Sequence, residues 1–333
     1  MKKLNHILLA GLALVAAVSC NKVNVPAEEP EQNVGVPMTL TATIGGAETK
    51  MTMAEDDNVL KATWDASEKI SVITYTGTGY GTKVQTVDTF TYTGDAGKKS
   101  VDFTGTFTGD AANNIWVVYP ALEYDSANED YRSASGLLYG VKKDDYHIYI
   151  GYWNGKYTQT SNADPSFLKD NLLTGTGTVS GSALTVDLEP ASGVLKMTLT
   201  LPSTAEVGSK VYGVKVTGTG GSLFRQVGSS SWTVIGNTTY GGWDSSGMIA
   251  LNGSEGITVP DDRKLVCYMP FEPYPSVTKF GVGGITAIKV DVSHAYYSGI
   301  NWVTPYSATK TLTADPAIAA EPGKMYRLEL VFD

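Results

Sequence analysis

The chain has 333 residues, more than one hydrophobic core usually organises, so its length favours two domains. It contains 36 Gly and 19 Tyr and is only 18% charged, which favours many short strands and turns over helices or coiled coils. A net charge of −9 without a basic stripe argues against nucleic acid as a partner, and three His and two Cys leave little for a metal site, a disulfide framework or histidine-based catalysis.

The N-terminus has the pattern of a bacterial lipoprotein signal peptide. Lys2 and Lys3 precede an apolar run at residues 7–18, which is too short to span a membrane as a helix. The run leads into AVSC, which resembles a lipobox and ends at Cys20, the residue that would carry the lipid. We expect residues 1–19 to be removed, which changes the net charge from −9 to −11. Ordinary signal cleavage that leaves Cys20 as a spare thiol is the alternative.

Residues 20–37 have the composition of a flexible tether that follows the lipidated Cys20. The segment holds three Pro and three Glu and has few apolar side chains. Each buried lipid methylene contributes about 0.8 kcal/mol, so the several acyl chains of a bacterial lipoprotein would anchor the protein without a spanning segment. We therefore expect an exported protein at the outer membrane and cell surface.

Strict alternation of apolar and polar residues predicts antiparallel strands with one solvated face along the rest of the chain. The first predicted strand, at residues 38–44, has its apolar side chains on one face: Met38, Leu40, Ala42 and Ile44. The same pattern recurs at residues 101–107, 193–201 and 326–332. Cys267 lies in another apolar run with no histidine near it in sequence, so we expect a buried structural thiol.

A small, polar, Gly-rich stretch at residues 174–182 is the best candidate for a boundary, since strong alternation resumes after it. We expect an all-β protein with an N-terminal β-sandwich at 38–180 and a C-terminal β-sandwich at 181–333.

Several segments carry a resemblance to a known family through their order along the chain. They are the lipobox, the strand at 38–44, ATWDASEKISV at 62–72, FTGTF at 103–107, IWVVYP at 115–120, PASGVLK at 190–196 and PGKMYRL at 322–328. Together they resemble the fimbrillin family of Bacteroidales, lipoproteins that build or decorate surface fimbriae. In the third of these segments, Ser67 and Glu68 stand where the family has Gly and Asp.

The resemblance implies two tandem transthyretin-like sandwiches and partner subunits that bind by strand addition. In the family an N-terminal strand is removed and a neighbour's strand fills its place, so Met38, Leu40, Ala42 and Ile44 mark the candidate donor or displaced strand. Polymerising relatives are commonly cut after an Arg, whereas no Arg precedes Arg132 in this chain. Lys50 is then the candidate processing site, and the chain is expected to act as a subunit, a minor subunit or an anchor.

We expect no catalysis, no cofactor and no metal, since the acidic pairs and the isolated histidines lack the spacing of catalytic or ligand sets. The alternative function is binding of a surface glycan by aromatic rings, because Tyr and Trp cluster at residues 146–157. Tyr149 and Trp153 share one strand face there and are the candidate sugar contacts. A host or bacterial surface ligand is the corresponding partner.

Overall fold

The computed structural model describes most of the chain from Gly35 onward and shows an all-β protein. The described residues are 35–44, 54–56, 59–61, 63–77, 83–126, 130–133, 138–142, 148–151, 158–170, 173–221, 224–225, 232–234, 238–240, 243–244, 246–271, 278–294 and 306–333. Among them, one short 3-10 helix, η2 (Ser166–Asp170), interrupts the strands. A search of the same residues finds no helix long and apolar enough to cross a membrane.

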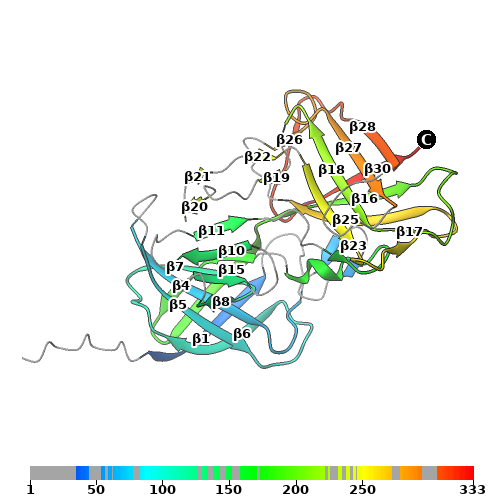
Figure 1. Cartoon of the computed structure of the whole chain (residues 1–333). Helices are drawn as coiled ribbons and strands as arrows, with labels where there is room; N and C mark the ends of the chain where they lie inside the picture. Colours follow the sequence, from blue (N-terminus) through cyan, green and yellow to red (C-terminus); the bar gives the residue numbers. More distant parts are fainter. Residues whose placement is uncertain are drawn as a thin grey trace, which may run out of the picture. The chain divides into compact units, whose positions relative to one another are not determined.

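The first sheet has eight strands and closes on itself. In spatial order they are β1 (Val36–Ile44), β6 (Ser100–Phe107), β5 (Lys83–Tyr92), β4 (Lys69–Thr76), β7 (Asn114–Tyr119), β13 (Leu173–Thr176), β15 (Ala183–Pro190) and β14 (Thr178–Ser180). β1 pairs antiparallel with β6 and parallel with β15, so the strand nearest the N-terminus joins the two ends of the sheet (Figure 1). The alternation predicted at 38–44 and 101–107 is confirmed.

The closed sheet surrounds the first hydrophobic core. Each strand contributes its apolar face because successive side chains of a strand point to opposite sides. Aromatic rings lie at the centre: Trp64 is fully buried and meets Phe103 and Tyr119 edge to face, with ring centroids 5.0 and 5.5 Å away. Such pairs contribute about 0.5 to 1.5 kcal/mol beyond the burial of their area.

The second core lies between two smaller sheets. The five-stranded sheet has the order β12 (Thr158–Gln159), β23 (Ser246–Leu251), β18 (Gly213–Thr219), β27 (Ala287–Ser293) and β28 (Tyr306–Thr311). The three-stranded sheet has the order β25 (Lys264–Phe271), β16 (Gly193–Thr200) and β30 (Met325–Val331). Leu195, Met197 and Leu199 of β16 and Leu328 and Leu330 of β30 are buried in this core, as their alternation predicts.

Side-chain amides cover the outer edge of β25. Gln159, which is fully buried, donates to the carbonyl of Val266 at 2.7 Å and accepts from the N–H of Tyr268 at 3.1 Å. Asn162 accepts from the N–H of Val266 at 2.8 Å and donates to the carbonyl of Lys264 at 3.1 Å. The segment around η2 thus satisfies backbone groups that a further strand would otherwise have to pair.

Shorter strands form the remaining sheets. A six-stranded sheet has the order β21 (Thr238–Tyr240), β20 (Trp232–Val234), β11 (Ile148–Gly151), β10 (Leu138–Lys142), β9 (Asp130–Ser133) and β8 (Leu122–Asp125). Two-stranded pairs are β17 (Lys210–Val211) with β24 (Ile257–Thr258), β19 (Phe224–Arg225) with β22 (Trp243–Asp244), β2 (Ala54–Asp56) with β3 (Val59–Lys61), and β26 (Lys279–Phe280) with β29 (Ile318–Ala319).

The Gly-rich stretch at 174–182 belongs to the first sheet. It forms β13 and β14, and β15, which follows the expected boundary at residue 180, pairs with β1, β13 and β14. Glycine is needed at 175 because β15 approaches closely: a Cβ there would lie 2.2 Å from the carbonyl oxygen of Asp187. A division at 180/181 would separate paired strands. We therefore propose that the chain passes from the first core to the second after Pro190, where β15 ends and β16 follows, whereas β12 and η2 form an earlier excursion to the second core.

Candidate functional site

The candidate site is the slot that β1 occupies between β6 and β15. On one side the register runs antiparallel, with Leu40 opposite Phe103. On the other side it runs parallel, with Leu40 opposite Leu184. In the described part of the chain, no strand other than β1 lies between the facing edges of β6 and β15, so both edges depend on it for pairing.

The two faces of β1 have opposite characters. Met38, Leu40, Ala42 and Ile44 point into the first core with exposed fractions of 7, 0, 0 and 7%. On the outer face Thr41 donates to a carboxylate oxygen of Asp102 at 2.7 Å, and the hydroxyls of Thr43 and Ser100 lie 2.9 Å apart. The strand and its apolar face are as the sequence predicts. Its displacement or donation stays a prediction.

The chain enters the slot through a close contact at Gly35. A Cβ at this position would lie 2.2 Å from Cγ2 of Thr106 and 2.9 Å from Cγ2 of Thr108, so a larger residue would require these two side chains to move. Ile44 ends the strand, and its N–H donates to the carbonyl of Lys99 at 3.1 Å. The slot therefore holds the whole length of β1.

The turn after Trp64 places Ser67, one of the two substituted positions, in a conformation that favours glycine. Ser67 has φ of 68°, a left-handed conformation in which glycine is favoured. The glycine of the family pattern would fit this conformation without strain. Glu68, the other substituted position, accepts a hydrogen bond from the hydroxyl of Tyr119 at 2.9 Å. The turn thus ties into the first core.

Cys267 is a buried thiol, as the sequence predicts. It lies on β25 with 1% of its surface exposed, and it is a free cysteine. Burial raises the pKa of its thiol to about 12, since a thiolate would lose its hydration there. The structure therefore offers no activated nucleophile at this position.

The remaining predicted sites fall largely outside the described residues. Cys20, Lys50 and Trp153 are not among them, and Tyr149 is described only as part of the backbone of β11. In the same six-stranded sheet the rings of Tyr124 and Tyr131 lie 5.1 Å apart, and Tyr124 is 48% exposed. Lipidation, processing and glycan contact stay predictions. Within the described part of the chain, no cluster of three or more His, Cys, Asp or Glu could hold a metal ion.

A groove between β28 and β30 is the feature that sequence reasoning missed. It is lined by side chains of both strands and of the segment between them, and it includes Lys310. One signal in the sequence was available: Lys310 stands in the inward register of β28, where Tyr306 and Ala308 are apolar. A charge at such a position indicates an exposed sheet edge.

No family model matches the chain, and no curated protein matches its sequence. Among solved structures, a proposed cell adhesion protein from Bacteroides ovatus matches with 13% identity and a TM-score of 0.41, over 89% of this chain and 92% of that chain. One from Bacteroides fragilis matches with 9% identity and a TM-score of 0.42, over 89% and 93%. The fimbrial anchor protein Mfa2 from Porphyromonas gingivalis matches with 12% identity and a TM-score of 0.34, over 78% of each chain. These three solved structures are thus described as cell adhesion or fimbrial proteins.

Proposed function

We propose that this chain is a non-catalytic, lipid-anchored surface protein that serves as a structural or adhesive component of fimbriae assembled by strand addition. The position of β1 carries the proposal. The strand directly follows the predicted tether, and within the described residues it is the strand that lies between the facing edges of β6 and β15. A strand in this position can leave the sheet without unthreading any other strand.

The physical consequence of losing β1 favours replacement by another strand. Burial of its four inward side chains contributes about 5 to 9 kcal/mol, which is comparable to the whole stability of a typical domain. Without β1, β6 and β15 would present unpaired edges, and the first core would be open between them. An extended segment with the same alternation would restore both the pairing and the burial.

The same strand accounts for the two predicted processing states. β1 ends at Ile44 and β2 begins at Ala54, so cleavage after Lys50 would release the whole strand and leave β2 intact. A chain that is cut would accept a neighbour's strand. A chain that stays whole from lipidated Cys20 would keep its own strand and act as an anchor or a minor subunit.

Intact-mass analysis of the protein from native cell surfaces tests this proposal. Recovery of the chain together with fibres supports a fimbrial role. A lipidated chain that begins at Cys20 indicates an anchor or a minor subunit, whereas a chain cut after Lys50 indicates a shaft subunit. Recovery of the chain only in fractions without fibres would contradict it. The variant Lys50→Ala should abolish the cut form, whereas Lys61→Ala, on β3, serves as the matched control.

A further inference from the structure

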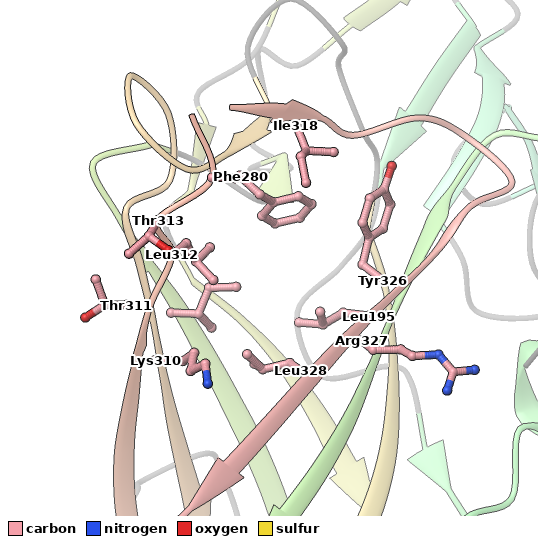
Figure 2. Close-up of a pocket in the computed structure, with 12 residues that line it drawn as sticks. Leu195, Phe280, Lys310, Thr311, Leu312, Thr313, Ile318, Tyr326, Arg327 and Leu328 are labelled. Carbon is pink, nitrogen blue, oxygen red and sulfur yellow. The ribbon is translucent and has the colours of Figure 1, made fainter. Parts of the chain in front are cut away.

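Two sheet edges border the second core, and they lie close together at one end and diverge at the other (Figure 2). β28 ends the five-stranded sheet and pairs with β27, and β30 ends the three-stranded sheet and pairs with β16. In the described part of the chain, no strand lies between them. Figure 2 shows β28 and β30 diverging toward Ile318 and Tyr326, with a groove of about 340 Å³ between them.

The floor and one wall of the groove are apolar. Leu195, Leu312 and Leu328 point into it from three strands or strand ends (Figure 2). The rings of Phe280 and Tyr326 lie 5.0 Å apart at its wide end. Ile318, at the same end, has 57% of its surface exposed. Leu195 and Leu328 are only 2 and 4% exposed. An apolar side chain of a partner would therefore find its contacts at the wide end, on Ile318 and the half-buried Leu312.

Hydrogen bonds hold the wall of the groove in place. The hydroxyl of Tyr326 accepts from the N–H of Glu321 at 2.7 Å and donates to the carbonyl of Ala319 at 3.4 Å. Ala319 belongs to β29, which pairs with β26. The groove is thus preformed, which lowers the entropy that a ligand must lose on binding.

The charge of the groove is opposite to that of the protein. Its charged lining residues are Lys310 and Arg327, and no acidic side chain lines it, although the chain carries a net charge of −9. In Figure 2 the amine of Lys310 lies beside Leu328, whereas the guanidinium of Arg327 points away. Lys310 therefore provides a positive charge next to an apolar surface, which favours a ligand with a carboxylate.

The backbone of β28 is oriented for a further strand. The N–H of Leu312 donates to the carbonyl of Thr286 at 2.8 Å, which directs the N–H groups of even-numbered residues in β28 toward β27. By the alternation of an antiparallel ladder, the N–H of Thr309 points toward the open side. β28 thus offers a hydrogen-bonding edge along the groove.

We propose that this groove docks an extended, acidic and apolar segment of a partner polypeptide. The segment adds to β28 as a strand, places apolar side chains against Leu312 and Ile318, and sets a carboxylate beside Lys310. β1 is the precedent within the same molecule, since it fills the gap between two sheet edges, antiparallel to one and parallel to the other. The proposal is independent of the fimbrial role, because it concerns a different core and does not require β1 to move.

Binding of synthetic peptides to the purified full chain, measured by isothermal titration calorimetry, tests the proposal. The probe is the peptide EVTVTVTE, capped at both ends. One control peptide, EVVVTTTE, has the same composition without alternation, and the other has Lys in place of both Glu. We expect the probe to bind and both controls to bind at least about tenfold more weakly.

Variants of the chain locate the binding. Thr309→Pro removes an N–H group from the open edge of β28 and leaves the hydrogen bonds to β27 in place. It should weaken binding of the probe peptide about tenfold or more. Lys310→Glu should weaken it about three- to tenfold, with Lys264→Glu as the matched control on β25. Ile318→Ser should weaken it about threefold, with the equally exposed Val282→Ser as its control. No binding, equal binding of the controls, or equal binding to all variants would overturn the proposal.

Discussion

The two cores differ in how the gap between their sheet edges is filled. Around the first core, β1 lies between β6 and β15, and its inward side chains are almost fully buried. Around the second core, the gap between β28 and β30 holds no described strand and forms a groove instead. The first core therefore depends on a strand close to the N-terminus, whereas the second core is complete without one. Loss of that strand should affect only one of them.

The largest effect is expected from removing residues 1–44. We expect the first core to lose about 5 to 9 kcal/mol and to unfold, while the second core remains folded. Urea unfolding of the truncated chain, followed by circular dichroism, should show two separate transitions or a smaller total change in signal than the native chain shows. A peptide of residues 35–44 should restore the lost transition, and a scrambled peptide should not. Unchanged unfolding of the truncated chain would contradict the role of β1.

Truncation of single leucines sharpens the same comparison. Leu40→Ala should cost about 3 kcal/mol, because Leu40 is fully buried in the filled slot. Leu312→Ala should cost only about 1 kcal/mol, since this side chain is half-buried at the open groove. Urea midpoints measure both. Thr39→Ala, on the exposed face of β1, is the control and should lie within about 0.5 kcal/mol of the native chain. Equal costs at the two leucines would erase the difference between the cores.

A gain of stability is expected at the turn of the first core. Ser67→Gly should stabilise the chain by about 0.5 to 1 kcal/mol, because glycine adopts the left-handed φ of 68° without strain. Thermal unfolding measures the change. Ala66→Gly, in the same turn but without a positive φ, should be destabilising by a similar amount. A loss of stability in Ser67→Gly would show that the serine side chain has a structural role.

The smallest expected effect concerns Cys267 in the second core. Despite the groove, the native chain should react with a thiol reagent at pH 8 far more slowly than the urea-unfolded chain, since burial raises the pKa to about 12. Below pH 9 the thiol is protonated in both states and contributes no pH dependence. Above the unfolded value of 9.0, only the unfolded thiol ionises, so the free energy of unfolding falls as the pH rises toward 12. Fast labelling of the native chain would mean that the groove admits solvent to the core.

Local patterns predicted the strands well and their grouping less well. The alternation at Met38 to Ile44 identified both the strand and its buried face. The Gly-rich stretch was interpreted as a boundary, yet Gly175 reflects the close approach of β15, and Gly181, with φ of 62°, forms the turn between β14 and β15. Glycine serves linkers, turns and close contacts alike, so composition could not distinguish them.

The sequence alone predicted the all-β class, the inward faces of β1, β6, β16 and β30, and the burial of Cys267. These features depend on the two-residue period of a strand and on local composition, which can be read directly from the chain. Strand partners depend on contacts between distant segments, which no local pattern specifies. The tertiary structure alone therefore decided that β1 would join β6 to β15, that Gln159 and Asn162 would cover the edge of β25, and that a groove would remain beside Lys310.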